Sequence, residues 1–301
     1  MLCVLEGPDR SGKSTLARKW SHQFGMQSRH FSKPEVHALD EYVKPLEVGA
    51  PHAVFDRYHI GERIWPEYFG RPTDYDVPMH RYVELALNSR GAVLVLTDRD
   101  PAELARVYAE ENEPVLPDDV DAIRNRFAQE AQLSILPSVV VDIERSPQRA
   151  LDAIGIAQQR AYRAQRISGV TPRWVGSPTA DVLLVGDQVG PGSGDWSLPF
   201  VPYRRTSGHF LMSELVLDRE LLSSVALVNS VQPNGEPENV LELWEELLRP
   251  KVVALGRLAE RRLQRIGLEH KAVAHPQYVR RFQRANGTGY YVNAIREASA
   301  A

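Results

Sequence analysis

The chain has 301 residues, a formal net charge of −3 and 43% hydrophobic residues, values typical of a globular protein with room for two domains. Its one cysteine, Cys3, excludes a disulfide framework, a cysteine-ligated zinc site and a four-cysteine iron–sulfur cluster. Because the net charge is slightly negative, any surface that binds nucleic acid has to be local. The sequence has no apolar run long enough for a bilayer and opens directly on an apolar strand, so we expect a cytoplasmic protein without membrane contact.

Apolar strands and amphipathic helices alternate through the first half of the chain. We expect strands at 2–5, 52–56, 92–97 and 138–142, and helices at 13–24, 78–89, 101–110, 118–134 and 147–163. Buried strands separated by helices are typical of a parallel sheet with helices on both faces. The first half is therefore predicted to be an α/β domain, residues 1–160.

A change of composition marks the predicted end of this domain. Residues 157–166 are polar and basic, and the glycines and prolines that follow them break regular structure, which indicates a linker at 161–177. A second α/β domain is predicted for residues 178–301. Its expected strands are 181–185, 225–229, 251–255 and 271–274, and its expected helices are 205–216, 237–248 and 257–266.

Residues 7–14, Gly-Pro-Asp-Arg-Ser-Gly-Lys-Ser, match the phosphate-binding loop G-x-x-x-x-G-K-[ST] between the first strand and the first helix. The backbone N–H groups of such a loop and the helix N-terminus favour phosphate oxygens. Lys13 is expected to reach the β- and γ-phosphates of ATP, and the Ser14 hydroxyl to bind Mg²⁺. The predicted ATP-binding residues are Gly7, Pro8, Asp9, Arg10, Ser11, Gly12, Lys13, Ser14 and Thr15.

Arg10 and the segment Asp56-Arg57-Tyr58 add further charged groups. Arg10 lies inside the loop, where a guanidinium can stabilise the transferred phosphate; the alternative is a solvated loop arginine. Asp56 and Arg57 end a predicted strand, where ligands of parallel sheets collect. We expect Asp56 to hold Mg²⁺ and Arg57 a phosphate, although a helix cap with a surface arginine is the alternative. Residues 58–72 form an aromatic and charged stretch, in which the aromatic side chains offer stacking faces for a base and the arginines offer phosphate contacts. The alternative is ordinary core packing of an amphipathic helix.

Together, Glu6 to Thr15 and Asp56-Arg57-Tyr58 resemble thymidylate kinase and related deoxynucleoside monophosphate kinases over about residues 1–150. The resemblance implies a P-loop kinase fold and transfer of the ATP γ-phosphoryl group to dTMP or a 5-modified dUMP. It implies that Lys13 and Arg10 contact phosphates and that Asp9 lies near the acceptor sugar. It also implies a substrate site at Asp56, Arg57 and Tyr58, with Arg57 on the acceptor phosphate, and a homodimer, which is common in that family.

The segment 108–121 departs from the arginine-rich mobile lid that members of this family often carry. It contains no arginine, and its acidic residues are Glu110, Glu111, Glu113, Asp118, Asp119 and Asp121. This composition fits the branch that carries its catalytic arginine in the phosphate loop, here Arg10.

Four short segments of the second half resemble, in order and spacing, the uracil-DNA glycosylase superfamily over about residues 178–296. Each is by itself typical of an ordinary loop; they are Gly186 to Gly192, Leu198-Pro199-Phe200, Val228-Asn229-Ser230 and His275-Pro276-Gln277. The resemblance implies that Asp187 is a water-activating acid and that His275 contacts the strand. It also implies that Phe200 stacks on a flipped base whose edge Asn229 reads, since a base has to leave the stack to be read in this way.

A basic cluster supports this second resemblance, and two features of the sequence differ from the superfamily pattern. The cluster Arg280, Arg281 and Arg284, near Tyr278 and Phe282, supplies the positive charge that DNA phosphates require, or else forms a solvated helix face. Val189 stands where the superfamily often has proline, and the iron–sulfur cysteines of some branches are absent. The domain could therefore bind a base without cleaving the glycosidic bond.

The leading hypothesis is a phage-type fusion of two enzymes of nucleotide metabolism, acting in the host cytoplasm. ATP and Mg²⁺ serve the kinase, whose substrate is a deoxynucleotide, and the second domain contacts DNA. In the alternative, the kinase phosphorylates a modified base such as 5-hydroxymethyluracil within DNA, and the second domain flips or binds that base without cleaving it. In a third reading the second half is a binding module that localises the kinase to DNA.

Overall fold

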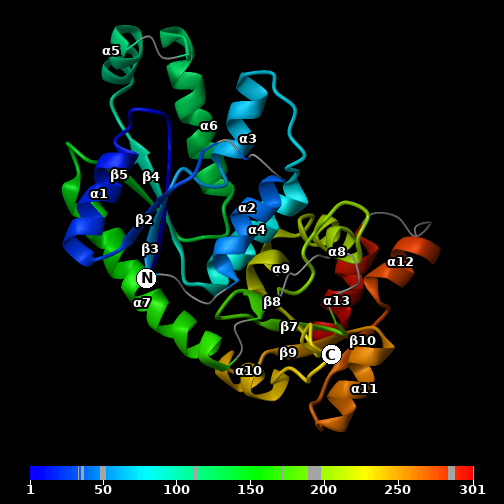
Figure 1. The fold of residues 1–301 in the computed structure, drawn as a ribbon. Coiled ribbons are helices and arrows are strands. Elements are labelled where there is room, and N and C mark those ends of the chain that lie inside the picture. Colours follow the sequence, from blue (N-terminus) through cyan, green and yellow to red (C-terminus); the bar gives the residue numbers. More distant parts are fainter. Residues whose placement is uncertain are drawn as a thin grey trace. The chain divides into compact units, whose positions relative to one another are not determined.

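The computed structural model describes residues 1–32, 34, 37–47, 52–111, 114–170, 173–188, 198–283 and 289–300. Three sets of predictions lie outside these residues: positions 189–192 of the glycine-rich loop, Glu113 of the acidic segment and Arg284 of the basic cluster. The chain divides into two compact units (Figure 1). The first comprises residues 1–42, 50–76 and 91–162, and the second comprises residues 43–49, 77–90 and 163–301.

The sheet of the first unit has five parallel strands in the order β2-β3-β1-β4-β5. The strands are β1 (Leu2–Glu6), β2 (Gln27–His30), β3 (Ala53–Asp56), β4 (Val93–Asp98) and β5 (Ser138–Asp142). Successive side chains of a strand point to opposite faces, and those of β1 are buried on both. Helices therefore cover both faces, and the parallel α/β sheet predicted for the first half is confirmed.

Strand β2 is the one strand of this sheet that the hydrophobic pattern does not predict. Its four residues are polar and exposed, and it lies at the edge of the sheet beside β3. An edge strand pairs on one side only and needs no buried face, so its sequence carries no alternation of apolar residues.

The helices up to residue 170 follow the predicted positions closely, with two short additions before and after β3. They are α1 (Lys13–Phe24), α2 (Ala38–Val43), α3 (Gly61–Tyr68), α4 (Val77–Ser89), α5 (Pro101–Glu111), α6 (Val120–Leu133) and α7 (Pro147–Val170), with 3-10 turns η1 (Lys44–Leu46) and η2 (Pro117–Asp119). Helices α1 and α7 share one face of the sheet. Their packed residues include Leu16, Trp20, Ala153 and Ala157, against Cys3, Leu5, Val93 and Val95 of the strands.

The sheet of the second unit has the order β10-β9-β7-β8-β6. Its strands are β6 (Trp174–Gly176), β7 (Val182–Gly186), β8 (Val225–Asn229), β9 (Lys251–Leu255) and β10 (Lys271–Val273), and all pairs are parallel except β6 with β8. The helices after residue 200 are α8 (Ser207–Leu215), α9 (Arg219–Ser224), α10 (Val240–Glu246), α11 (Arg257–Arg265), α12 (Pro276–Phe282) and α13 (Tyr290–Ala300). The second half is thus also α/β, and the strand starts and ends match the predicted ones within two residues.

The segment 161–177 is not the irregular linker that its composition suggests. Helix α7 continues to Val170, and β6 occupies Trp174–Gly176. The helix persists because Ala157, Ala161, Ala164 and Ile167 form a buried apolar stripe at helical spacing among the polar residues. That stripe is made mostly of alanine, so a reading based on large apolar residues overlooks it.

Two segments expected in the first domain belong to the second unit, namely 43–49 and 77–90. Helix α4 is buried on nearly all sides, which requires partners around it. The Tyr82 hydroxyl donates to the carbonyl of Pro199 at 2.6 Å, and the fully buried Arg90 guanidinium donates to the carbonyls of Leu46 (2.8 Å) and Trp174 (3.3 Å). No helix of the described part of the chain is long and apolar enough to cross a membrane.

Candidate functional site

The loop between β1 and α1 has a backbone path that excludes side chains at two positions. Gly7 has a φ of 139° and Gly12 a φ of 97°. A Cβ atom on Gly7 would lie 2.3 Å from the carbonyl oxygen of Thr97, and one on Gly12 would lie 2.4 Å from Cδ1 of Ile143. The two glycines of the phosphate-loop motif are therefore required by both conformation and space.

Lys13 is held inside the loop by the loop's own carbonyl groups. Its Nζ donates to the carbonyl oxygens of Gly7 (2.7 Å) and Pro8 (2.5 Å) and lies 3.9 Å from Asp9 Oδ1. The side chain is 3% exposed, and this burial lowers the pKa of Lys13 to about 8. Phosphate oxygens are stronger acceptors for an ammonium group than carbonyl oxygens, so the arrangement suits an anionic ligand.

Ser14 and Asp56 come together at the carboxyl end of the sheet, as the sequence predicts for a magnesium site. The Ser14 hydroxyl donates to Asp56 Oδ2 at 2.7 Å, and His30 Nδ1 lies 3.0 Å from the same oxygen. Asp56 Oδ1 is buried and makes no hydrogen bond within the described residues. A hydroxyl beside a carboxylate with an unsatisfied oxygen fits Mg²⁺, which prefers oxygen ligands. His30 was not foreseen, because it lies on the unpredicted strand β2.

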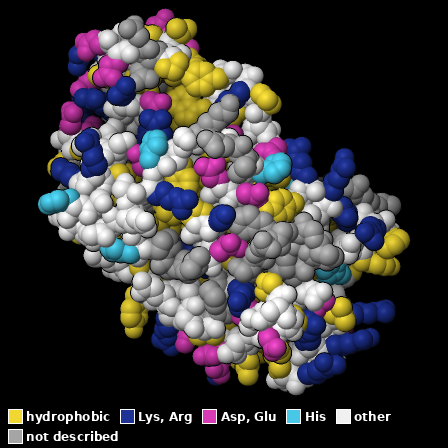
Figure 2. All heavy atoms as spheres, in the orientation of Figure 1, with side chains coloured by type: hydrophobic (Ala, Val, Ile, Leu, Met, Phe, Trp, Pro, Cys, Tyr) yellow, Lys and Arg dark blue, Asp and Glu magenta, His cyan; other side chains and the backbone are white. Residues whose placement is uncertain are grey.

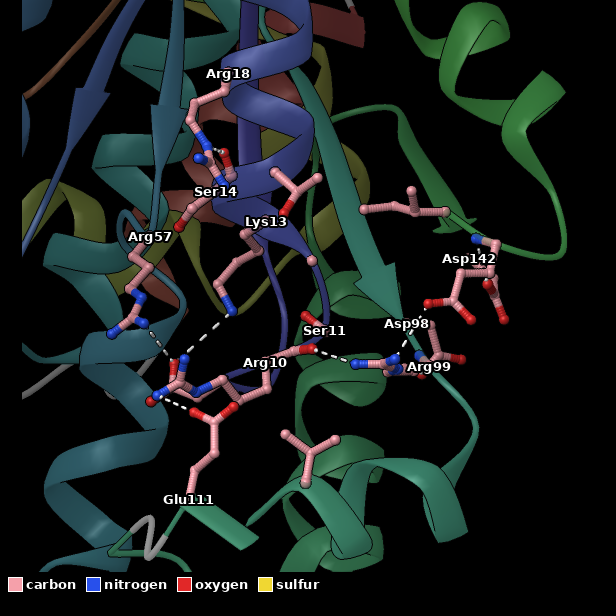
Figure 3. A pocket seen from close by; sticks show the side chains of 16 residues that line it. Arg10, Ser11, Lys13, Ser14, Arg18, Arg57, Asp98, Arg99, Glu111 and Asp142 are labelled. Atoms are coloured by element: carbon pink, nitrogen blue, oxygen red, sulfur yellow. Dashed lines mark hydrogen bonds and ion pairs between the residues drawn. The ribbon is translucent and has the colours of Figure 1, made fainter.

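A cavity of about 590 Å³ opens in front of the loop, and we call it the donor cavity (Figure 3). Asp9 to Thr15 all line it, whereas Gly7 and Pro8 contribute to the loop behind it. Figure 3 shows Arg10, Lys13 and Arg57 pointing toward the same space. On the far side, the acidic Asp98 is bound by both Nε (2.6 Å) and Nη2 (2.7 Å) of Arg124.

Arg10 forms an exposed ion pair with a glutamate at the edge of the donor cavity. Its Nη2 atom lies 2.6 Å from Glu111 Oε2, and both side chains are nearly half exposed. An exposed pair of this kind is worth only ~0–1 kcal/mol, so an anionic ligand can replace Glu111 at little cost. Glu111 belongs to the acidic segment, which therefore neutralises the loop arginine.

A second cavity of about 360 Å³, which we call the acceptor cavity, adjoins the loop on its other side. Its aromatic lining comprises Phe31, Tyr42, Tyr58, Trp65, Phe69 and Phe127. Tyr58 is itself buried, and its hydroxyl donates to the carbonyl of Tyr42, so it forms the wall of the cavity. Planar aromatic walls suit a planar ligand such as a nucleobase.

Charged side chains in the acceptor cavity are fixed by hydrogen bonds. Glu62 accepts from Arg71 Nη2 and from Thr73 Oγ1, both at 3.0 Å. Glu6 Oε1 accepts from the backbone N–H groups of Tyr58 (3.1 Å) and Ile60 (2.9 Å). Burial raises the pKa of the Glu6 carboxyl group. The sequence analysis placed Glu62 and Arg71 in the aromatic and charged stretch 58–72 and Glu6 in the kinase motif, but assigned no role to either glutamate.

Asp9 and Arg57 line both cavities. Arg57 Nη2 lies 3.2 Å from Asp9 Oδ1, and Arg57 has a φ of 59°, in the left-handed region that non-glycine residues seldom occupy. Its backbone N–H donates to the carbonyl of Leu5 at 3.0 Å, which fixes this conformation at the end of β3. The pair therefore stands at the junction of the two cavities.

The residues singled out in the second half gather at the carboxyl ends of β7, β8 and β10. A Cβ atom on Gly186 would lie 2.4 Å from the Phe200 ring and 2.6 Å from Asn229 Oδ1. Asn229 is 7% exposed, and its side chain makes no hydrogen bond within the described residues. Phe200 and Asn229 thus lie close to the same glycine.

Asp187 and His275 both make contacts within the second unit. The Asp187 carboxylate forms an ion pair with Arg262 of α11, whose Nη1 also donates to Ser230 Oγ at 3.1 Å. His275 Nδ1 accepts from the N–H of Gln277 at 3.1 Å and caps α12. Burial lowers the pKa of His275, and the negative charge of Asp187 opposes that shift. Arg262 was missed, because a single arginine among several on α11 carries no sequence signal.

Basic side chains gather over α11 and α12 (Figure 2). Arg281 is exposed, and Arg280 Nη1 donates to the carbonyl of Arg205 at 2.5 Å. The rings of Tyr278 and Phe282 lie 5.2 Å apart and are largely exposed. The described part of the predicted basic cluster is therefore at the surface, next to two aromatic rings.

Known structures resemble about half of this chain. The YorR protein from Bacillus subtilis in complex with phosphorylated GDP is 20% identical, covers 54% of this chain and 98% of its own, and has a TM-score of 0.47. The structure of deoxyadenosine kinase from M. mycoides with the products dCMP and dCDP is 14% identical, covers 53% of this chain and 98% of its own, and has a TM-score of 0.32. The structure of the same enzyme with dCTP is 16% identical, covers 53% of this chain and 99% of its own, and has a TM-score of 0.34. No family model and no curated protein matches the chain. With TM-scores below 0.5, these likenesses do not themselves define a function, which has to rest on the site.

Proposed function

We propose that the first unit is an ATP-dependent kinase whose acceptor is a deoxynucleotide. The observation that carries the proposal is the junction of the two cavities at Asp9 and Arg57. One cavity has the lining of a phosphate site, and the other has the lining of a nucleobase site. Transfer of a phosphoryl group needs these two ligands in line, with positive charge between them.

Different residues of the donor cavity bind the phosphates of ATP, stabilise the transferred group and hold the metal ion. The N–H groups of the loop and Lys13 hold the β- and γ-phosphates of ATP, and Arg10 leaves Glu111 to stabilise the charge on the transferred group. Ser14 and Asp56 hold Mg²⁺, which neutralises phosphate charge when bound. His30 orients the Asp56 carboxylate through its hydrogen bond.

For the base of the acceptor we propose thymine or a 5-modified uracil, as in dTMP or a 5-modified dUMP, because the aromatic walls suit a planar ring. The base lies between the aromatic walls, and the fixed pair Glu62 and Arg71 offers both an acceptor and a donor to its edge. Arg57 then lies beside the group that receives the phosphate. A 5-substituent carrying a hydroxyl group would give such a substrate a second acceptor atom.

Transfer of radiolabel from γ-labelled ATP tests this proposal. Purified protein is incubated with Mg²⁺ and dTMP, dUMP, 5-hydroxymethyl-dUMP or DNA containing 5-hydroxymethyluracil. The expected result is label on at least one acceptor, and its loss in the Lys13→Ala variant. Lys19→Ala, which changes an exposed lysine on the same helix, is the matched control. Absence of label on every acceptor contradicts the proposal.

For the second unit we propose a glycosylase-like site that binds an unstacked base of DNA. The nearly buried Asn229 amide, which has no hydrogen-bond partner among the described residues, supports this role together with Phe200 and Gly186 beside it. The exposed Arg281, Tyr278 and Phe282 support it as well. The ion pair with Arg262 engages Asp187 through Oδ1 and leaves Oδ2 without that contact. The second candidate is a kinase acting on a modified base within DNA, with the second unit binding that base without cleaving it.

A single-turnover assay on DNA with uracil or 5-hydroxymethyluracil separates these two forms of the proposal. Binding without abasic sites is expected, and Asn229→Ala is expected to remove the preference for the modified base. Abasic sites formed by the wild type would instead establish a glycosylase, and lack of any base preference would contradict a base-reading role.

A further inference from the structure

The charges that line the acceptor cavity do not suit a doubly negative phosphate group. Among the described residues, the charged groups are three carboxylic acids, Glu6, Asp9 and Glu62, and two arginines, Arg57 and Arg71. Whether Glu6 is protonated or ionised, this set carries no net positive charge. Each arginine is moreover paired with a carboxylate, Arg57 with Asp9 and Arg71 with Glu62.

Fewer backbone N–H groups face the acceptor cavity than the donor cavity, where Asp9 to Thr15 of the phosphate loop line the wall. There, the loop N–H groups and the N-terminus of α1 add positive potential that side chains alone do not supply. At the acceptor cavity, the N–H groups of Tyr58 and Ile60, just ahead of α3, already donate to Glu6. A phosphate dianion placed here would have to displace a carboxylate from an arginine.

Asp9 is the carboxylate at the point of transfer. It lines both cavities, and its Oδ1 atom is buried and makes no hydrogen bond within the described residues. Arg57 (3.2 Å) and Lys13 (3.9 Å) hold it in place by charge. The Tyr108 hydroxyl donates to its backbone carbonyl at 2.9 Å, so the backbone is fixed as well. Since Arg57 and Lys13 both face Oδ1, the oxygen of this fixed carboxylate that is left to accept a proton is Oδ2.

We infer that the acceptor atom of this kinase is the oxygen of a neutral hydroxyl group and that Asp9 is its general base. The inference rests on the proposed phosphoryl transfer and names the class of acceptor. The hydroxyl oxygen forms a bond to the γ-phosphorus of ATP while the bond from that phosphorus to the β–γ bridging oxygen breaks. Asp9 takes the hydroxyl proton and later releases it to water, so ATP and an alcohol give ADP, a phosphate monoester and one proton.

A phosphate acceptor would reverse the effect of Asp9. A phosphate oxygen is already deprotonated and needs no base, and the carboxylate would repel it. Neutralising Asp9 would then leave the rate unchanged or raise it. The isosteric variant Asp9→Asn therefore gives results of opposite sign for the two kinds of acceptor.

The experiment combines product analysis with this variant. Wild-type protein, MgATP and a panel of acceptors are incubated, and ³¹P NMR distinguishes a new phosphate monoester from a new diphosphate. The panel comprises the four deoxynucleosides, their monophosphates, 5-hydroxymethyl-deoxyuridine, its monophosphate and DNA containing 5-hydroxymethyluracil. The inference predicts a monoester and a fall in kcat of roughly 100-fold or more in Asp9→Asn, with the KM for ATP within about threefold of wild type.

The control is Asp152→Asn, which removes an exposed carboxylate on α7 that lines neither cavity and should leave both constants unchanged. The inference is overturned if the product is a diphosphate or if the rate of Asp9→Asn is unchanged or higher. It is also overturned if the protein binds ATP but forms no monoester from any hydroxyl compound. The product formed by the wild type decides the matter even if Asp9→Asn does not fold. Failure to bind ATP at all would instead refute the proposed function, and calorimetry with MgATP separates that case.

Discussion

The titration of Lys13 gives a quantitative test of the phosphate loop. Burial lowers its pKa from 10.5 to about 8, which corresponds to roughly 3 kcal/mol lost from the charged form at 1.36 kcal/mol per pKa unit. A bound triphosphate supplies anionic acceptors and restores the preference for the charged form. At pH 8 about half of Lys13 carries a proton in the free protein and nearly all of it in the complex, so binding takes up about 0.5 proton per ATP.

The direction of the pH dependence follows from the same shift. Because the complex has the higher pKa, MgATP affinity is greatest below pH 8, where Lys13 is already charged, and falls as the pH rises. From pH 7 to pH 9 the charged fraction in the free protein drops about tenfold, and we expect the affinity to drop by about the same factor.

Calorimetry at pH 8 in two buffers of different ionisation enthalpy measures this proton uptake. In Lys13→Met we expect no uptake and affinity weaker by about 10- to 100-fold, as for loss of a hydrogen bond to a charged group. Lys19→Met, which changes an exposed lysine of α1, is expected to behave as wild type. Tight MgATP binding by the wild type without buffer-dependent heat, or uptake that persists in Lys13→Met, would refute the reasoning.

Three other changes test separate parts of the account. Gly7→Ala places a Cβ against the Thr97 carbonyl at a positive φ, so we expect loss of at least about 2 kcal/mol of stability in chemical unfolding; an unchanged midpoint contradicts this. Glu6→Ala leaves two N–H groups unsatisfied and should cost about 2–6 kcal/mol, whereas Glu6→Gln, which keeps an acceptor oxygen, should cost much less. Because burial raises the pKa of Glu6, the contribution of this group to folding stability is fully present below its unfolded pKa near 4 and is lost as the pH rises through its folded pKa. Thermal unfolding measured from pH 4 upward should show this loss of stability in the wild type and not in Glu6→Gln. Arg262→Gln frees the Asp187 carboxylate, and we expect lower stability but unchanged phosphoryl transfer; a loss of kinase activity in a variant that remains folded would count against independent roles of the two sites.

The phosphate loop was predictable from the sequence because its chemistry depends on consecutive residues. Gly7, Gly12, Lys13 and Ser14 have the same relation to one another in every strand–loop–helix of this kind. Ser14 and Asp56 were each expected to bind Mg²⁺, and they come together because β1 and β3 end at the same edge of the sheet. The buried strands were predictable for a similar reason, since both faces of each strand are apolar.

The remaining features depend on contacts that no local pattern records. His30 reaches Asp56 from a polar edge strand, and Arg262 reaches Asp187 from a helix distant in sequence. The acidic stretch that lacks the arginines of the family's lid provides Glu111, whose contact with Arg10 no sequence pattern records. The helical end of α7 was hidden by small alanines that bury little area yet pack closely.

Binding of bisubstrate compounds tests most directly the central claim that the two cavities are halves of one site. In two such compounds, the polyphosphate chain of adenosine is esterified either to the 5′-oxygen or to the hydroxymethyl oxygen of 5-hydroxymethyl-deoxyuridine. The account predicts that at least one binds about 100-fold or more tightly than ATP or the nucleoside alone, and that Arg57→Ala removes most of this gain. If neither compound binds more tightly than ATP, the two cavities do not form one site and the account is contradicted.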